Sequence, residues 1–254
     1  MYSFLTLHNC ITELQFGVRV KHSTDHALLS LTETIRDALD NSNFACGIFI
    51  DLQKAFDTVD HQILLKKLEY YGVRGLANNW FRSYLTNRKQ YVSVNGFDSS
   101  EKLMKYGVPQ GSVLGPLLFL IYINDLNKEI KFSLGHHFAD DTNLLYTDKS
   151  LKRIQKYVNL DLRFLCKWLK ANKISLNASK TELIIFRDPR KKISFNLKIK
   201  IDGKKLLPSK FVKYLGVLID CHLNWNFHEM DLHSKLTRAN GMLSKIRHFV
   251  NHQT

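Results

Sequence analysis

Hydrophobic and polar residues follow two different periods along this chain, and the change of period separates the expected helices from the expected strands. Residues 23–41 place apolar side chains on one face at helical spacing, and Ser23 at their start is a good capping residue. Residues 44–50 instead form a compact apolar run that ends at Asp51. This second pattern predicts a buried strand followed directly by a carboxylate.

The rest of the chain alternates between these patterns in a mixed order. Further helices are expected at 60–71, 75–86, 114–126, 150–171 and 227–250. Further strands are expected at 90–95, 132–138, 142–147, 182–187, 196–201 and 211–219. This order predicts an α+β fold with a mostly antiparallel sheet of the split β-α-β kind, and it argues against a doubly wound fold.

Charge points to a polyanionic partner. The chain of 254 residues has a formal net charge of +14, and residues 149–213 hold 19 Lys and Arg against four Asp and Glu. Such an excess predicts a phosphate backbone along that stretch, although a basic protein without such a partner is the plainer alternative.

The apolar runs and the cysteines limit the cellular compartments in which this protein is expected. The longest apolar run, 113–123, contains Gly115 and Pro116 and is too short to cross a bilayer. The beginning of the chain does not resemble a secretory signal. We therefore expect an intracellular protein of the nucleus or cytoplasm, with no membrane partner. No disulfide framework or zinc ribbon is expected from the widely separated Cys10, Cys46, Cys166 and Cys221.

Two acidic sites carry candidate chemistry. Asp51 follows a buried strand, and Asp140 and Asp141 lie at the tip of an expected hairpin. Carboxylates brought together repel one another unless cations lie between them, and hard oxygen ligands suit Mg²⁺. A pair of such ions can promote nucleotidyl transfer. The alternative is that Asp51 caps a helix and the other two form a plain turn.

A glycine-proline loop is the third candidate. Gly107 and Gly111 flank Pro109 and Gln110. Glycines allow the backbone to approach a ligand closely, and the Gln110 amide offers both a donor and an acceptor. By itself the loop is also compatible with an ordinary turn.

Segments 49–57, 107–117, 138–141, 168–181 and 214–220 form a series whose order and spacing match a known set of motifs. They resemble motifs A to E of reverse transcriptases, and the likeness is strongest to jockey-like non-LTR retrotransposons of animals. An upstream stretch, 15–24, also resembles the finger segment of that family. The five segments are 49–57 (motif A), 107–117 (B), 138–141 (C), 168–181 (D) and 214–220 (E, the primer grip).

The resemblance implies roles for the acidic residues and their neighbours. Asp51, Asp140 and Asp141 correspond to the metal ligands, and the backbone of Leu52 helps to hold a metal or the triphosphate. The implied cofactor is a pair of Mg²⁺ ions, with Mn²⁺ as a possible substitute. Lys180 corresponds to a general acid that protonates the pyrophosphate, and a simple phosphate contact is the alternative.

The resemblance also implies contacts with substrates. Phe56 corresponds to a steric gate that selects dNTPs, with a core aromatic as the alternative. The incoming nucleotide is expected at Gly107, Pro109, Gln110 and Gly111. Nucleic acid is expected at Arg19, Tyr214, Leu215 and Gly216.

The implied fold is a partial right-hand polymerase, and the implied partners are an RNA template, a DNA primer and dNTPs. Fingers would comprise 1–41 and 73–101, the palm 42–72 and 102–220, and the start of a thumb 221–254. We expect a chain cut short at both ends, without the endonuclease domain of the parent element. A non-catalytic nucleic-acid-binding relic and an RNA-dependent RNA polymerase are the alternatives.

One pair of residues departs from the family. His136 and His137 precede Asp140, where less polar residues are expected. A solvated strand edge is the preferred interpretation of this pair over a ligand role.

Overall fold

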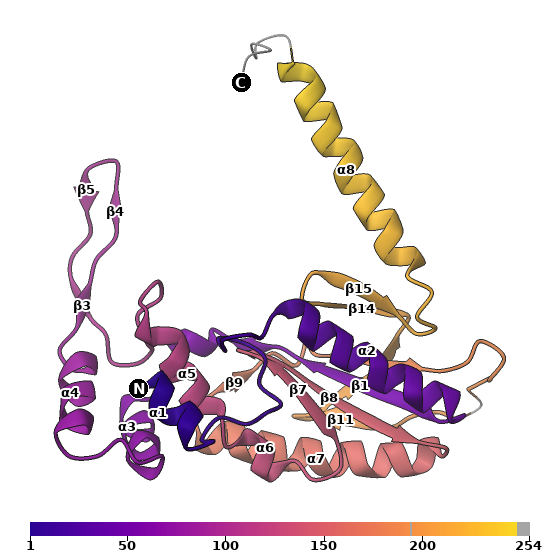
Figure 1. Cartoon of the computed structure of the whole chain (residues 1–254), viewed down its shortest axis with the longest axis horizontal. Helices are drawn as coiled ribbons and strands as arrows, with labels where there is room; N and C mark the ends of the chain where they lie inside the picture. Colours follow the sequence, from indigo (N-terminus) through magenta and orange to yellow (C-terminus); the bar gives the residue numbers. More distant parts are fainter. Residues whose placement is uncertain (194, 248–254) are drawn as a thin grey trace.

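The computed structural model describes residues 1–193 and 195–247, and a five-stranded sheet forms its centre (Figure 1). Its strands are β1 (Phe44–Ile50), β7 (Leu134–Phe138), β8 (Asp141–Asp148), β10 (Glu182–Phe186) and β13 (Pro208–Ser209). They lie in the order β13–β10–β1–β8–β7, and all neighbours are antiparallel except β10 and β13. The prediction of an α+β fold with a mostly antiparallel sheet is therefore confirmed.

The helices follow the predicted pattern closely. They are α1 (Tyr2–Leu7), α2 (Thr24–Asp40), η1 (Ala55–Asp57, a 3₁₀ turn), α3 (His61–Tyr70), α4 (Leu76–Leu85), α5 (Leu114–Ile123), α6 (Leu126–Glu129), α7 (Leu151–Ala171) and α8 (Asn226–Ile246). The expected helix at 114–126 is divided between α5 and α6. The end of the expected helix at 227–250 lies outside the described residues.

Five two-stranded pairings surround the sheet. They are β2 (Leu52–Gln53) with β9 (Ser175–Leu176), β3 (Lys89–Gln90) with β6 (Lys102–Leu103), β4 (Ser93–Val94) with β5 (Phe97–Asp98), β11 (Ile199–Ile201) with β12 (Lys204–Leu206), and β14 (Phe211–Tyr214) with β15 (Val217–Asp220). The single strand expected at 211–219 is wrong. The chain turns back there because Leu215 and Gly216 adopt φ angles of 47° and 88°.

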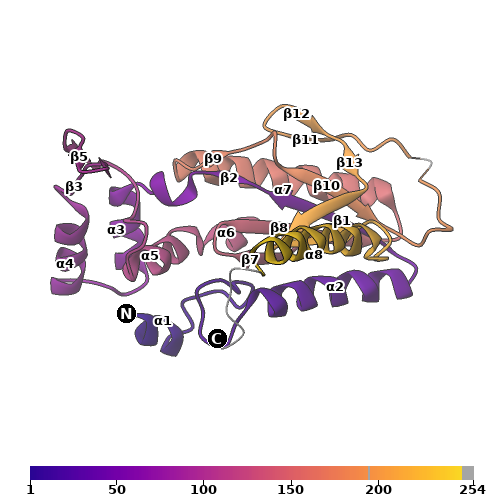
Figure 2. The same cartoon turned by 90° about the horizontal axis from the view of Figure 1, so that it is seen from above.

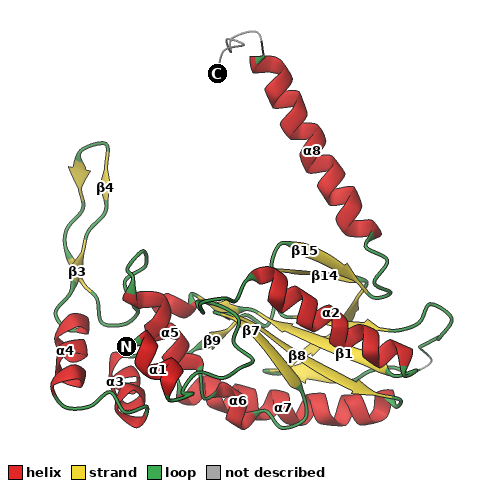
Figure 3. Ribbon diagram, viewed as in Figure 1, coloured by secondary structure: helices red, strands yellow, loops and turns green. Residues whose placement is uncertain are grey.

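The sheet is buried on both faces, and successive residues of β1 supply opposite cores. Ile48 packs in the core that includes α3, α5 and α7, whereas Phe49 packs in the core formed with α2 and the β14–β15 hairpin. Figure 3 shows the sheet between these layers. Alternation of side chains along a strand produces this division, and burial on both faces explains the unbroken apolar run of β1.

Local capping fixes the helix that follows the first acidic site. The Asp60 side chain accepts hydrogen bonds from the N–H groups of Gln62 (2.9 Å) and Ile63 (3.0 Å) at the start of α3. At the other end Gly72 adopts a φ of 93°, and its N–H donates to the carbonyl of Glu69. The predicted glycine stop of this helix is confirmed.

Two elements project from the same side of the sheet. The ribbon of β3–β6 and β4–β5 and helix α8 rise on that side, whereas α7 and β11 lie on the other (Figure 1). Figure 2, seen from above, shows α8 over the strands and the β11–β12 hairpin beside α7. No side chain of α8 is buried. Among the described residues, no helix is both long enough and apolar enough to cross a membrane.

Candidate active site

The three acidic residues meet at one end of the sheet. Asp51 directly follows β1, and the pairing of Ile50 with Thr142 places it beside Asp141 at the start of β8. Asp140 lies in the two-residue turn that joins β7 to β8, because Phe138 pairs with Asp141. Antiparallel pairing of β1 and β8 thus brings together carboxylates that are about 90 positions apart in the sequence.

The charges of these carboxylates are coupled. Partial desolvation, followed by the charges of Asp140 and Asp51, raises the pKa of Asp141 to about 6. Desolvation and the charge of Asp51 also raise the pKa of Asp140. In the described residues none of the three has an ion-pair partner, whereas Asp60, for example, lies 2.7 Å from the Lys173 ammonium. Negative potential is therefore concentrated at this corner.

The negative potential at Asp51, Asp140 and Asp141 favours the binding of a divalent metal ion. Unneutralised carboxylates at a sheet edge are the hard oxygen donors that Mg²⁺ and Mn²⁺ prefer, and a cation among them would relieve their repulsion. Across residues 1–193 and 195–247, however, no three His, Cys, Asp or Glu side chains converge closely enough to form a complete ligand set. The donor chemistry fits a divalent ion, and the side chains would have to converge when one binds.

Strain is concentrated in the turn that carries Asp140. Ala139, the first residue of the turn, adopts a φ of 55°, in the left-handed region that a residue with a Cβ rarely occupies. Such strain persists only where surrounding contacts hold the backbone in place. Here the contact is the side chain of Gln15, whose Oε1 accepts the N–H of Ala139 at 3.0 Å.

Gln15 ties a distant segment to this turn. Its Oε1 also accepts the N–H of Gly17 at 2.8 Å, and its side chain is 3% exposed. The same segment extends the sheet at the edge of β7, since the Phe16 N–H donates to the carbonyl of His137 at 2.8 Å. Gln15 belongs to the segment expected as part of the fingers, and no local pattern in the sequence predicts its contact with the turn that carries Asp140.

Gly17 allows this close packing. A Cβ at Gly17 would lie 2.4 Å from the backbone nitrogen of Ala139 and 3.0 Å from the carbonyl carbon of Phe138. No side chain can be accommodated at these distances. The segment therefore contacts the turn through backbone, and a glycine at this position is a steric requirement.

The expectation of a solvated edge at His136 and His137 is wrong, because both residues are buried. His137 Nε2 donates to the Asn127 Oδ1 at 2.5 Å, and His136 Nε2 bonds with the Ser30 hydroxyl at 3.1 Å. Desolvation lowers the pKa of each to about 4. The N-terminal segment and α2 cover this edge of the sheet. Both imidazoles are therefore uncharged at physiological pH and serve to pack this edge.

The glycine-proline loop packs against the segment that follows Asp51. The N–H of Val108 donates to the carbonyl of Phe56 at 2.9 Å, and the Gln110 side chain donates to the Asp57 carboxylate at 2.8 Å. A Cβ at Gly107 would meet the Asp57 backbone at 2.8 Å, and its φ is 87°. Pro109 continues the loop. Sequence reasoning found the loop but missed Asp57 as the partner of Gln110.

Gly111 and Phe56 are the sequence neighbours of Gln110 and Asp57, whose side chains form this hydrogen bond. Gly111 adopts a φ of 77° with open space around it. Phe56 is half-buried, and its ring centroid lies 4.4 Å from that of Phe119 in α5. One part of the Phe56 ring thus packs in the core while the rest stays accessible. This position is compatible both with a steric gate and with a core aromatic residue.

A cavity of about 360 Å³ joins the first acidic site to the segment of motif D. Asp51, Leu52, Lys54 and Lys180 all line it. It forms because Leu52 pairs with Leu176 across β2 and β9. The structure therefore brings Lys180 to the same space as Asp51, and it adds Lys54, a cation that sequence reasoning did not single out.

The residues expected to contact nucleic acid differ in their accessibility. Tyr214 is 3% exposed, and its ring lies 5.5 Å from that of Phe49, so its side chain packs in the core, and its contact with nucleic acid stays a prediction. Leu215 and Gly216 form the accessible tip of the hairpin. The Arg19 guanidinium donates from Nη1 to the carbonyls of Thr12 (3.1 Å) and Gln15 (3.2 Å), which fixes it beside the catalytic turn.

Comparisons with known proteins agree with this geometry. A sequence model described as "Reverse transcriptase (RNA-dependent DNA polymerase)" matches residues 1–219. The chain is 31% identical to the probable RNA-directed DNA polymerase from transposon BS of Drosophila melanogaster, over 98% of this chain and 28% of that protein. It is 30% identical to the RNA-directed DNA polymerase from mobile element jockey of the same species, over 86% of this chain and 24% of that protein.

Solved structures with low sequence identity share the fold. Apo telomerase from Candida tropicalis matches with a TM-score of 0.55 at 14% identity, over 88% of this chain and 38% of that chain. Telomerase from Candida albicans in complex with a fragment of telomeric RNA matches with a TM-score of 0.53 at 16% identity, over 86% of this chain and 36% of that one. The fold is thus that of part of a right-hand polymerase, and the chain spans about a quarter of the length of its curated relatives.

Proposed function

This chain belongs to the reverse transcriptase (RNA-dependent DNA polymerase) family, and on that premise we propose that it supplies the catalytic core of an RNA-directed DNA polymerase of a non-LTR retrotransposon. One observation carries the proposal. Asp51, Asp140 and Asp141 share one corner of the sheet, desolvation and the neighbouring carboxylates raise the pKa values of Asp140 and Asp141, and none of the three has an ion-pair partner among the described residues. A carboxylate cluster left unneutralised is suited to divalent ions and phosphates.

In this proposal the reaction adds a dNTP to the 3′-hydroxyl of a DNA primer paired with an RNA template. Two bound Mg²⁺ ions would activate the primer hydroxyl and stabilise the charge of the leaving pyrophosphate. Asp51, Asp140 and Asp141 would hold them, and the backbone of Leu52 would face the triphosphate. The protein contributes positioning and electrostatics, as in other phosphoryl transfers.

Cations of the cavity beside Asp51 support a site for the triphosphate. Lys180 lines this cavity and is exposed, so its ammonium can approach a phosphate and donate a proton to the pyrophosphate. Lys54 lines the same cavity and would add a second positive charge.

Selection of the nucleotide falls to the neighbouring loop. Phe56 would exclude a ribose 2′-hydroxyl by its bulk. The loop of Gly107, Pro109, Gln110 and Gly111 would contact the base pair being formed. Support comes from the hydrogen bonds that fix this loop against Phe56 and Asp57.

The template-primer would lie on the side of the sheet from which the ribbon and α8 project (Figure 1). Residues 1–41 and 73–101 would act as fingers, 42–72 and 102–220 as palm, and the chain from 221 onward as the start of a thumb. Leu215 and Gly216, at an accessible hairpin tip, would contact the primer, and Arg19 would contact the template. An endonuclease domain would belong to the parent element, and the protein would act in the nucleus or cytoplasm.

Primer extension on an RNA template tests the proposal, in this chain or in a longer chain that carries it. Asp140→Ala should lower the extension rate by roughly 10³-fold or more, since it removes a charge that the transition state requires. Asp40→Ala, at an exposed carboxylate of α2, is the matched control and should extend normally.

Near-normal extension by Asp140→Ala would refute the metal-site assignment. A wild-type chain that binds template-primer but extends no primer would support the non-catalytic alternative. Preferred incorporation of rNTPs would support an RNA polymerase.

A further inference from the structure

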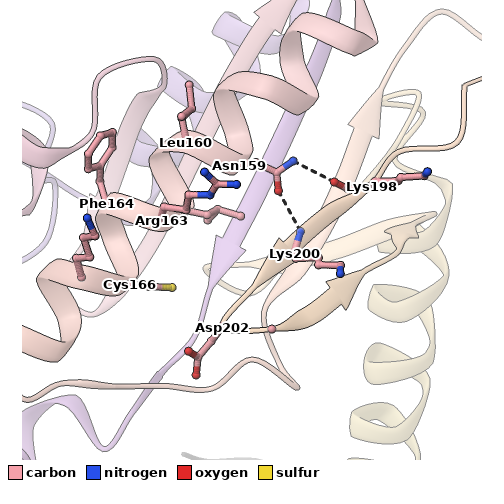
Figure 4. Close-up of a pocket in the computed structure, with 11 residues that line it drawn as sticks. Asn159, Leu160, Arg163, Phe164, Cys166, Lys198, Lys200 and Asp202 are labelled. Atoms are coloured by element: carbon pink, nitrogen blue, oxygen red, sulfur yellow. Dashed lines mark hydrogen bonds between the residues drawn. The ribbon is translucent and has the colours of Figure 1, made fainter.

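A second and larger cavity lies away from the candidate active site. It has a volume of about 720 Å³ and is formed between α7 and the β11–β12 hairpin (Figure 4). This groove lies on the side of the sheet opposite α8 and the ribbon, where no part of the proposed template-primer path runs (Figure 1). The proposed polymerase reaction gives this groove no role.

The walls of the groove are strongly cationic. Arg163 and Lys167 come from α7, Lys200 comes from β11, and Lys198 directly precedes β11. In the described ranges, 1–193 and 195–247, none of these four side chains forms an ion pair. The one lining carboxylate, Asp202, already has a cation of its own.

That cation is Lys170, whose ammonium nitrogen lies 3.5 Å from the Asp202 carboxylate. The acid therefore does little to neutralise the four cations of the groove. Like charges gathered without counter-charges repel one another, and a bound polyanion would relieve this repulsion.

The cations form two rows rather than one cluster. Arg163 and Lys167 are four residues apart on α7, so they occupy one face about one helical turn apart. Lys198, just before β11, and Lys200 within it are two residues apart in extended chain, and both are exposed while Ile199 between them is buried. Repeated charges along two rows suit an extended charged polymer better than a small compact anion.

Hydrogen bonds between the walls fix the spacing of the rows. The Asn159 side chain of α7 donates to the carbonyl of Lys198 at 3.0 Å and accepts the N–H of Lys200 at 3.2 Å. Gln155, one turn earlier, accepts the N–H of Lys198 at 2.6 Å. Figure 4 shows Asn159 bridging to β11. The edge of β11 is thus held against α7, which lowers the entropy cost of binding a ligand there.

We propose that this groove is a second nucleic-acid-binding site, which takes the phosphodiester backbone of a single strand outside the polymerase cleft. Phosphate contacts from Arg and Lys do not read sequence, so the site should bind strands of any sequence. The proposal rests on the proposed function only in taking a nucleic acid as ligand, because the groove contains none of the catalytic carboxylates.

Fluorescence anisotropy tests the proposal with the polymerase cleft filled first by saturating unlabelled template-primer. Labelled single-stranded RNA, or DNA of the same sequence, is then titrated at several salt concentrations. Lys198→Glu/Lys200→Glu should weaken binding roughly tenfold or more and lower the salt slope by about 1.4, at about 0.7 per lost phosphate contact. Arg36→Glu/Lys66→Glu changes the net charge equally at exposed positions of α2 and α3 and is the matched control.

An equal loss in the two double variants would overturn the proposal, because total charge rather than the groove would then account for binding. Asp140→Ala should bind the strand normally, so failure of the catalytic assignment remains distinguishable from failure of this one. RNA and DNA bound equally would indicate recognition of the shared backbone, and RNA alone would indicate an added 2′-hydroxyl contact.

Lysine acetylation read by mass spectrometry supplies a second measurement on the unaltered protein. The single strand should protect Lys167, Lys198 and Lys200 and leave Lys66 reactive. Equal protection by inorganic phosphate or by polyglutamate would overturn the proposal in favour of a small-anion or an acidic-protein site.

Discussion

Gly17→Ala should displace the turn that carries Asp140 and so lower primer extension, although it substitutes none of the proposed metal ligands. In the structure an added Cβ would lie 2.4 Å from the Ala139 backbone nitrogen, whereas ordinary van der Waals contacts begin at 3.4 Å. The difference, 3.4 − 2.4, means that the two backbones must separate by about 1.0 Å. The obstructing atoms belong to the main chain, so no side-chain rotation relieves the clash.

The Gln15 hydrogen bonds limit how this separation can occur. Gln15 accepts the N–H groups of Gly17 and Ala139 through the same oxygen, so a shift of one strains or breaks its bond to the other. The turn that carries Asp140 then either moves with the segment or relaxes from its left-handed conformation. Misplacement of reacting groups by about 1 Å can lower a rate about 10²-fold, and we expect a loss of that size in primer extension.

The assay compares single-nucleotide incorporation by Gly17→Ala with that by Gly241→Ala, whose added Cβ would meet open space on α8. Mn²⁺ affinity, measured on the same proteins, should fall for Gly17→Ala alone. Urea unfolding separates a local effect from general loss of the fold. If Gly17→Ala is folded and incorporates nucleotides within threefold of the wild type, the segment does not position the turn and the reasoning is refuted.

Four further predictions concern the candidate site and the core. Phe56→Val should raise the use of rNTPs relative to dNTPs, and an unchanged ratio of kcat/KM values would assign Phe56 to the core. Mn²⁺ affinity should fall about tenfold per pH unit below about pH 6, because desolvation and the nearby carboxylates raise the pKa of Asp141 to about 6; Asp141→Asn should flatten this profile. In the metal-free chain the same raised pKa makes Asp141 stabilise the folded state only while it is protonated. The free energy of unfolding of the wild type relative to Asp141→Asn should therefore fall as the pH rises through about 6, as urea titrations of both proteins at pH 4 and pH 8 would detect. Comparing the two proteins cancels the opposite contribution of the buried His136 and His137, whose pKa values are lowered to about 4. Asp161→Ala should lower the free energy of unfolding by at least about 3 kcal/mol, because this buried carboxylate accepts three backbone N–H groups from residues 131–133; a loss below about 1 kcal/mol in urea unfolding would contradict that role.

The sequence by itself determined the elements whose signals are local. The apolar run 44–50 matches β1 in full, and Gly72 ends α3 as expected. Helical periodicity and capping act over a few residues, so they can be recognised without knowledge of the partners. The three acidic residues were found from local signals too, since Asp51 follows an apolar run and Asp140 and Asp141 lie between two expected strands.

Only the tertiary structure decided how distant segments complete the site. The hydrogen bond from Ala139 to Gln15 joins residues 124 positions apart, and neither residue has a periodicity that predicts it. The burial of His136 and His137 depends on the same segment, and that of Tyr214 depends on packing against Phe49 from another strand. A strand pattern specifies which side chains share a face, but what covers that face or its edge depends on the rest of the fold. Hydrogen bonds and close packing between remote parts of the chain therefore set the geometry of the catalytic corner, and they have no signature in the local sequence.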